Sequence, residues 1–357
     1  MKHLILILPF LVWNCEDGSN QDQIKSDNPS LVEQNDSNNV EPILTFDPIK
    51  SIPDSVHFRG LYNLGETFFI SGTDGNILFK DDKLSIAELT EAKYTDLRDI
   101  HVLSDSSILV MGIASPGHIW KIKKGETAWR KVYTNMDSTV FMDGMDFWND
   151  SVGLVYGDPV GGYHFILKTV DGGETWNRIL EDKIPAKLEI EAGFAASGTG
   201  VVCMGDGVAY LAFGGSKARI FKTTDYGETW ADIETPMLQG TGGKGIYALA
   251  FKDELNGVGI GGNWEDPKCD SSKIFTNNGG KTWNLATGVQ HYRSGVTYVK
   301  DNIYISTGTS GTDISYDGGN SWELIDSLGF NAILFKNEHE GFAIGSRGAL
   351  SSVRLNK

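Results

Sequence analysis

Charged and aromatic residues that could bind a ligand recur along this chain, each near the beginning or the end of a short apolar segment. Arginine binds carboxylate, sulfate or phosphate groups by paired hydrogen bonds. Tryptophan and tyrosine offer flat faces on which a sugar ring can stack. The candidate ligand-binding residues are Arg59, Arg98, Asp143, Asp158, Glu191, Arg219, Trp264, Tyr292 and Arg293.

Some of these side chains are also candidates for glycoside hydrolysis, which needs two carboxyl groups at a fixed separation. The catalytic candidates in that case are Asp99, Asp143, Glu191 and Tyr292. A second interpretation stays open: the charged side chains pair with one another around a water-filled channel and thereby satisfy buried polar groups.

Seven short apolar segments, each ending at a glycine, repeat through most of the chain. Successive glycines are 40, 45, 48, 56, 47 and 37 positions apart. They are Gly72, Gly112, Gly157, Gly205, Gly261, Gly308 and Gly345. Short strands at such a period are typical of a β-propeller. The sequence therefore predicts an all-β fold over residues 43–357, a single seven-bladed propeller of four-stranded antiparallel blades. Each glycine is expected to end the second strand of its blade, and Glu191 is expected at the start of the fourth blade's innermost strand.

The last blade has room for only three strands within residues 331–357. An unpaired edge there would leave the ring open and prone to aggregation. Residues 43–52 are predicted to supply the outermost fourth strand, where Pro48 is tolerated because that strand has a free edge.

A second repeat follows several of these segments, as in Lys168-Thr-Val-Asp-Gly-Gly-Glu-Thr-Trp176. It predicts a hairpin turn in which the Asp or Asn side chain accepts hydrogen bonds from the turn and a glycine adopts positive φ. The tryptophan is expected to pack against a neighbouring blade. The structural residues of this repeat are Asp171, Trp176, Asp225, Trp230, Asn278, Trp283, Asp317 and Trp322.

This second repeat resembles the Asp-box, or BNR repeat, at four positions. The chain is similar to the photosystem II stability/assembly-factor family and, more distantly, to sialidase propellers. The resemblance implies that the Asp-box turns are structural and lie on the face opposite the ligand site. It also implies a non-catalytic protein that binds a protein partner or an anionic or glycan ligand at the channel mouth.

The sialidase likeness supplies the alternative, a glycoside hydrolase. Sialidases place arginines, an aspartate and a glutamate in one order along the chain, which Arg59, Asp99, Glu191, Arg219 and Arg293 reproduce here. The motif after Phe58-Arg59 departs from the sialidase pattern, and Tyr292 precedes the last arginine instead of following it. Sialidase propellers also have six blades. The binding protein is therefore the favoured interpretation.

Composition excludes several functions. A net charge of −16 argues against a nucleic-acid partner, which requires a basic surface. The seven histidines show no metal-ligand spacing, and three cysteines are too few for a disulfide scaffold. We expect no metal, no cofactor and a monomer.

The N-terminal residues are predicted to direct export. A short basic start and ten apolar residues precede Cys15, which fits a lipoprotein-type signal peptide over residues 1–15 with Cys15 as the lipidated residue. Residues 16–42 are polar and predict a disordered linker. The expected location is the bacterial cell envelope, in the periplasm or at the cell surface, with the lipid as the only membrane contact. The alternative is an ordinary secretory peptide with an incidental Cys15.

Overall fold

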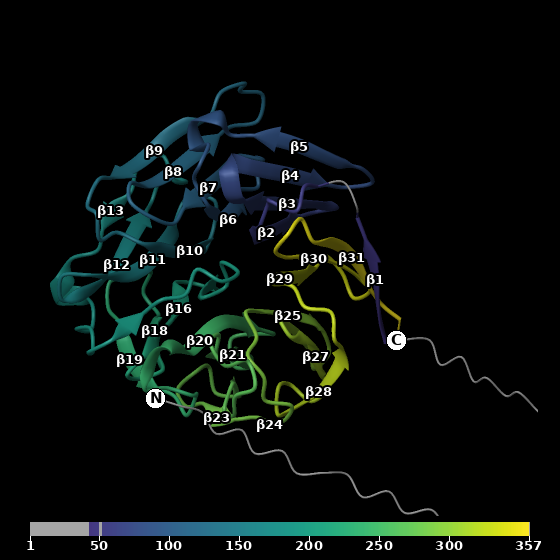
Figure 1. Cartoon of the computed structure of the whole chain (residues 1–357). Helices are drawn as coiled ribbons and strands as arrows, with labels where there is room; N and C mark the ends of the chain where they lie inside the picture. Colours follow the sequence, from purple (N-terminus) through teal and green to yellow (C-terminus); the bar gives the residue numbers. More distant parts are fainter. Residues whose placement is uncertain (1–42, 50–51, 357) are drawn as a thin grey trace, which may run out of the picture. The chain divides into compact units, whose positions relative to one another are not determined.

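Seven antiparallel β-sheets stand side by side around a central axis (Figure 1). The computed structural model describes residues 43–49 and 52–356, and in them the only helical segments are three short 3-10 turns, η1 (Thr73–Gly75), η2 (Thr90–Ala92) and η3 (Glu181–Lys183). The prediction of a seven-bladed all-β propeller is confirmed.

The first three blades follow the chain in order, and each strand pairs with the next. Blade one comprises β2 (Phe58–Leu64), β3 (Thr67–Gly72), β4 (Asn76–Lys80) and β5 (Leu84–Glu88). Blade two comprises β6 (Leu97–Val102), β7 (Ile108–Gly112), β8 (Gly117–Ile122) and β9 (Arg130–Asn135). Blade three comprises β10 (Met142–Phe147), β11 (Gly153–Val160), β12 (Tyr163–Thr169) and β13 (Asn177–Arg178).

Blade four corrects the expected strand assignment. Its strands are β15 (Val201–Met204), β16 (Val208–Ala212), β18 (Arg219–Thr223) and β19 (Ala231–Glu234). Gly205 therefore follows the innermost strand instead of ending the second one. The cause is the long connection of residues 179–200 after blade three, which displaces the repeat along the chain.

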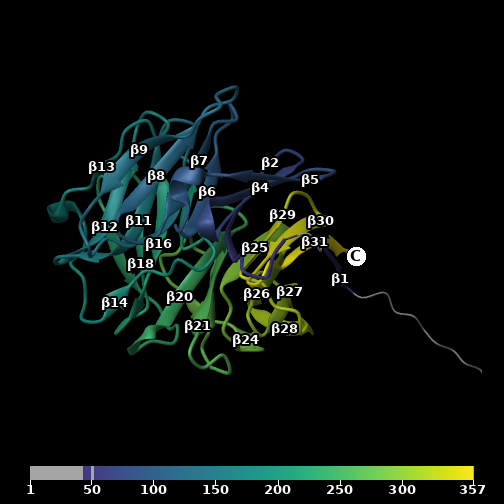
Figure 2. The same ribbon diagram turned by 45° about the horizontal axis from the view of Figure 1, so that its top comes forward.

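Glu191 belongs to this connection and not to an innermost strand. It lies in β14 (Glu191–Ala192), which is labelled in Figure 2. β14 pairs with β17 (Gly214–Gly215), and β17 pairs in turn with β20 (Thr241–Phe251). Blade five continues from β20 with β21 (Gly257–Asn263), β22 (Lys273–Thr276) and β23 (Asn284–Leu285). The sheet of blade five thus extends to the residues that follow β16 of blade four and to the connection that precedes that blade.

Blade six comprises β25 (Gly295–Lys300), β26 (Ile303–Gly308), β27 (Gly311–Ser315) and β28 (Ser321–Asp326), with β24 (Thr287–Gly288) parallel to β28. Blade seven comprises β29 (Ala332–Phe335), β30 (Glu340–Ile344), β31 (Leu350–Leu355) and β1 (Leu44–Pro48). β1 pairs antiparallel with β31, from Leu44 opposite Leu355 to Pro48 opposite Ser351. The predicted N-terminal strand that closes the ring is confirmed.

The turns at Asp171, Asp225, Asn278 and Asp317 share one hydrogen-bond pattern. In blade three, Asp171 accepts bonds from the Thr175 amide at 2.9 Å and from the Thr169 hydroxyl at 2.8 Å. The Gly173 amide donates to the Thr169 hydroxyl at 2.9 Å. Gly173 has a φ of 80°, and a Cβ there would lie 2.3 Å from Leu109 of blade two. The turn is therefore held tightly against the preceding blade.

The tryptophans after these turns also contact the preceding blade. Trp176 packs in a cluster with Leu109 and Met111 of blade two, and Trp322 packs with Val258 of blade five. These buried rings join adjacent blades, as predicted for this repeat.

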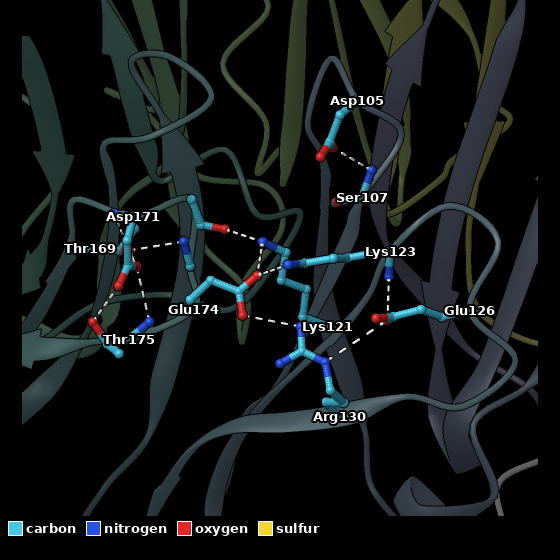
Figure 3. A network of polar contacts seen from close by, with 12 residues as sticks. Asp105, Ser107, Lys121, Lys123, Glu126, Arg130, Thr169, Asp171, Glu174 and Thr175 are labelled. Carbon is cyan, nitrogen blue, oxygen red and sulfur yellow. Dashed lines mark hydrogen bonds and ion pairs between the residues drawn. The ribbon is translucent and has the colours of Figure 1, made fainter.

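An ion network reinforces the junction of blades two and three (Figure 3). Glu174, in the turn after β12, accepts bonds from Lys123 at 2.8 Å, from Lys121 at 3.0 Å and from Arg130 at 3.0 Å. Lys121 also donates to the Gly172 carbonyl at 2.7 Å. Bonds from Lys123, and then from Lys121, lower the pKa of Glu174 to about 2.

The predicted signal peptide, Cys15 and the linker of residues 16–42 lie outside the described residues. Cys203 and Cys269 are both unpaired. In the part of the chain that the structure describes, no helix is long and apolar enough to cross a membrane, and no His, Cys, Asp and Glu side chains group as a metal site.

Deleting residues 43–48 should destabilise the propeller, because it exposes the edge of β31 and removes the buried Leu44. Burial of one leucine side chain stabilises by about 2 kcal/mol, and the lost strand pairing adds to this. We expect the melting temperature to fall by on the order of 10 °C. The matched control deletes residues 16–42 from the same full-length chain and should melt like the wild type. Equal melting of the two deletion variants would contradict closure by β1.

Candidate functional site

A cavity of about 460 Å³ opens at the mouth of the channel, on the face where the innermost strands begin. This face lies opposite the turns at Asp171, Asp225, Asn278 and Asp317, because those turns join the third and fourth strands of antiparallel blades. The cavity is lined by Arg59, Arg98, Phe141, Asp143, Gly193, Phe194, Ala195, Ala196, Tyr247, Trp264, Tyr292, Thr309 and Asn331.

A β-bulge aims a side chain at this cavity in blades one, two, three and five. In blade one, Phe58 pairs with Gly72 and Gly60 pairs with Ser71, so that Arg59 is the extra residue. The same shift in the other three blades leaves Arg98, Asp143 and Tyr247 as extra residues. A bulge redirects a side chain out of the strand's regular alternation. Four bulged side chains thereby line one cavity.

The repeated glycines make these bulges possible. Gly72, Gly112, Gly157 and Gly261 stand opposite the residue that precedes each bulge. A Cβ on Gly157 would lie 2.1 Å from the Phe141 carbonyl, and one on Gly261 would lie 2.0 Å from the Gly245 carbonyl. Atoms cannot approach so closely, and the absence of a side chain is therefore required for space.

The segment of residues 193–199 crosses the mouth and forms one wall of the cavity. Arg59 donates to the Ala196 carbonyl at 3.1 Å, and Arg98 donates to the Ala195 carbonyl at 2.6 Å. Asp158 accepts a bond from the Gly193 amide at 2.9 Å. Contacts with blades one, two and three thus hold this segment across the ring.

Arg59 brings an uncompensated positive charge to the cavity. Among the described residues, no carboxylate lies within ion-pair distance of Arg59, whereas Arg98 is bonded to Asp96 at 2.7 Å. Burial, and then the neighbouring Arg98, lower the pKa of Arg59 to about 10. Arg59 remains charged at neutral pH and is the guanidinium with most capacity for an anionic group.

Asp143 is a buried acid beneath the crossing segment. Its carboxyl oxygens are buried and make no hydrogen bond of ordinary geometry with the described residues, and the nearby Ala195 amide only partly opposes the effect of burial. Burial, and then the nearby Asp158, raise the pKa of Asp143 well above its ordinary value of 3.8. The carboxyl group therefore keeps its proton where an exposed aspartate has lost it.

Four predicted ligand-binding residues, Asp158, Glu191, Arg219 and Arg293, do not line the cavity. Arg219 bonds both carboxylate oxygens of Glu191, at 2.7 and 2.6 Å. Arg293 is buried and bonds Asp313 at 2.6 Å. Of the four arginines among the predicted ligand-binding residues, only Arg59 and Arg98 line this cavity. The open alternative of mutual pairing describes the other two.

Glu191 is fixed within its own ion network. Burial acts to raise its pKa, but bonds from His164 and Arg219 outweigh that effect and lower the pKa to about 2. Its side chain is fully buried and stays ionised in this pairing. It anchors the connection between blades three and four.

Asp158 and Asp99 do not line the cavity either, and both accept hydrogen bonds from backbone amides. Asp158 holds the Gly193 amide, as described above. Asp99 lies deeper in the channel, where its carboxyl oxygens accept the amides of Ile100 at 2.8 Å and Met145 at 2.7 Å. Burial raises the pKa of Asp99 to about 8. The bond to Met145 connects the inner strands of blades two and three.

Five of the nine predicted ligand-binding residues line the cavity: Arg59, Arg98, Asp143, Trp264 and Tyr292. Phe141, Phe194 and Tyr247 line the cavity but were not among the residues predicted from the sequence. The sequence repeat could have indicated Tyr247, because Tyr247 follows the residue that pairs with a repeated glycine, as Arg59 does. Phe194 carried none, because it lies in a connection that the repeat does not contain.

Solved structures of proteins with different functions are similar in fold to this propeller. YCF48 from Cyanidioschyzon merolae superposes with a TM-score of 0.59 at 14% identity, over 88% of this chain and 100% of that chain. A structure of YCF48 bound to D1 peptide gives a TM-score of 0.60 at 14% identity, over 89% and 97%. The GH74 xyloglucanase from Xanthomonas campestris gives 0.61 at 10% identity, over 88% of this chain and 54% of that one.

The likeness shows the fold. Identities this low leave the function of the chain to be argued from its own cavity. No family model and no curated protein matches the chain.

Replacing Asp143 with asparagine should make the folded state less sensitive to pH. In the wild type, unfolding frees the carboxyl group to ionise above its ordinary value of 3.8, whereas the folded state keeps it protonated, so stability falls as pH rises. The amide side chain of the variant does not titrate. We expect the melting temperature of Asp143→Asn, relative to wild type, to rise between about pH 4 and about pH 8.

The control for this measurement is Asp82→Asn, at an exposed position. It makes the same side-chain change outside the cavity. A difference from wild type that stays constant with pH for Asp143→Asn would show that Asp143 ionises freely in the folded protein.

Proposed function

We propose that this chain is a non-catalytic binding protein that holds a segment of a partner protein in the mouth cavity. The observation that carries the proposal is the convergence of four bulged side chains on one cavity, where Arg59 has no carboxylate partner among the described residues. Residues that bind one ligand must lie close together, and a rigid scaffold holds them there. No second function has comparable support from the geometry.

The charge of the cavity favours an acidic group on the partner. The chain carries a net charge of −16, and yet the mouth presents Arg59 without a carboxylate partner among the described residues. A carboxylate from a partner can form paired hydrogen bonds with this guanidinium. The YCF48 structure with bound D1 peptide supports the proposal by example, since that propeller of similar fold takes a peptide.

The geometry gives the glycoside-hydrolase alternative little support. Both glycosidase mechanisms need two carboxyl groups that flank the sugar linkage. Asp143 is the one acidic residue that lines the cavity among the residues described, and the crossing segment covers its oxygens. Asp99 and Glu191 are engaged elsewhere.

Selection from a phage-displayed library of random peptides, about twelve residues long, tests the proposal on the immobilised full-length chain. We expect enriched peptides with acidic residues, and we expect Arg59→Ala to weaken their binding by at least about tenfold through loss of a charged hydrogen bond. Arg354→Ala is the matched control, because Arg354 is an exposed arginine of β31 outside the cavity.

Two results would overturn the proposal. One is the absence of any peptide whose binding depends on Arg59. The other is hydrolysis of fluorogenic glycosides that Asp143→Asn abolishes, which would favour the enzyme.

We also propose that the protein is exported and lipid-anchored at Cys15, which rests on the sequence of residues 1–15. In a bacterial host grown with labelled palmitate, the wild-type chain should carry the label and fractionate with membranes. Cys15→Ser should lose both properties, and Cys203→Ser should retain them. Equal labelling of wild type and Cys15→Ser would reject the anchor.

A further inference from the structure

A groove of about 740 Å³ lies between blade six and blade seven. Its walls are the connection from β28 to β29, the loop between β30 and β31, and the closing strand β1. The connection and the loop both lie on the mouth face, where the innermost strands begin, because successive strands of each blade are antiparallel. The groove therefore opens on the same face of the propeller as the mouth cavity.

The groove is apolar. Its lining residues include Phe46, Pro48, Leu328, Phe330, Ala349 and Leu350. The rings of Phe46 and Phe330 are stacked, with centroids 5.3 Å apart. Leu328 is 49% exposed. An apolar hollow of this size is typical of a binding site.

The groove and the mouth cavity share a wall. Phe330 lines the groove, and the next residue, Asn331, lines the mouth cavity. A Cβ on Gly329 would lie 2.0 Å from the Gly308 carbonyl oxygen and 2.9 Å from the carbonyl carbon of Thr309, and Thr309 also lines the mouth cavity. The connection from β28 to β29 thus reaches from the groove to the mouth, and a partner segment held in the mouth can continue along it.

Arg347 brings a second guanidinium group to this path. It lines the groove, and its amide donates to His57 Nδ1 at 3.4 Å, two positions before Arg59 of the mouth. No carboxylate of the described residues lies within ion-pair distance of Arg347, as for Arg59. Asp54 is the one acidic residue among the described lining of the groove. The path as a whole is positively charged and favours an acidic partner.

This combination of charge and apolar surface suits a polypeptide better than a lipid or a glycan. A fatty-acid chain carries its charge at one end only, whereas guanidinium groups lie both in the mouth and beside the groove. A glycan would leave hydroxyl groups without hydrogen-bond partners against the apolar walls. An extended polypeptide presents apolar and acidic side chains at intervals along one segment.

We infer that the groove binds the continuation of the partner segment that the mouth cavity holds. Apolar side chains of this segment pack against Phe46, Leu328 and Phe330, while its acidic residues meet Arg59 and Arg347. The inference rests on the proposed function and extends the binding site from the mouth to the closing strand β1. This strand then has a second role, because it supplies one wall of the groove.

The test uses fluorescein-labelled synthetic peptides with the most enriched phage-selected sequences, titrated against the full-length chain by fluorescence polarisation. Their sequences should combine apolar with acidic residues, and replacement of the apolar residues by Ser should weaken binding by at least about tenfold. Leu328→Asp should weaken binding to a similar degree, because it places a negative charge in the groove. Arg347→Ala should weaken it by about threefold to fivefold, since an ion pair at an exposed residue contributes little.

Matched controls for these variants lie outside the groove. Leu255→Asp makes the same change at a residue that is 57% exposed, in the loop between β20 and β21 on the opposite face. Arg354→Ala removes an exposed arginine of β31 that does not line the groove. Both should bind the labelled peptides within about twofold of wild type. Melting curves of all four variants should match that of the wild type.

Photo-cross-linking locates the peptide directly. A selected peptide in which photo-leucine replaces an apolar residue should cross-link to residues 328–330 or 347–351, as identified by mass spectrometry. Cross-links confined to other parts of the propeller would contradict binding in the groove.

The outcomes separate this inference from the proposed function. Peptides that depend on Arg59 but tolerate both Leu328→Asp and Arg347→Ala would overturn the inference and leave the proposed function in place. Failure to enrich any peptide would overturn both. Binding of a fluorescent fatty acid that Leu328→Asp abolishes, with peptide binding unchanged, would overturn the assignment of the groove to a polypeptide.

Discussion

The contact between a bulged innermost strand and a glycine of the second strand underlies the site. At Gly157 and Gly261 a carbonyl oxygen of the neighbouring strand occupies the space that a Cβ would need. The close approach lets the innermost strand accommodate one extra residue, and that residue turns from the sheet toward the axis. The same bulge therefore recurs in four blades, and each time it turns one side chain toward the axis. This side chain is an arginine in two blades, an aspartate in one and a tyrosine in one.

The buried acidic groups of this protein avoid an isolated charge in two ways, by ion pairing or by keeping a proton. Glu191 with Arg219, and Asp313 with Arg293, form buried ion pairs, which avoid the cost of an isolated charge. Asp143 and Asp99 instead retain their protons, because burial raises the pKa of each. Neither arrangement leaves a charge for a ligand. Arg59 has no carboxylate partner among the described residues and keeps its charge at neutral pH. This gives the mouth its positive character within an acidic protein.

Closure and blade junctions keep this mouth rigid. β1 completes blade seven, so the first described strand is bonded to the last. The tryptophan-bearing turns and the Glu174 network join successive blades on the opposite face, while Asp99 and Asn331 join inner strands near the axis. The segment of residues 193–199 is held from several blades at once. A cavity built from different blades depends on each of these contacts.

Local repeats in the sequence determined the number of blades, the turn positions and the closing strand. Each of these follows from hydrogen bonding and packing between residues near in sequence, or from one unpaired edge that must be covered. Arg59, Arg98 and Asp143 were also predictable, because they stand at the starts of innermost strands. Only the tertiary structure decided which arginines line the cavity and which are buried in ion pairs. Arg219 meets Glu191 across 28 positions, through a connection that has no counterpart in the other blades. That connection also delivers Phe194 and the carbonyls of Ala195 and Ala196 to the mouth. No periodic pattern encodes its path, since long-range packing and charge pairing fix it after the blades have formed.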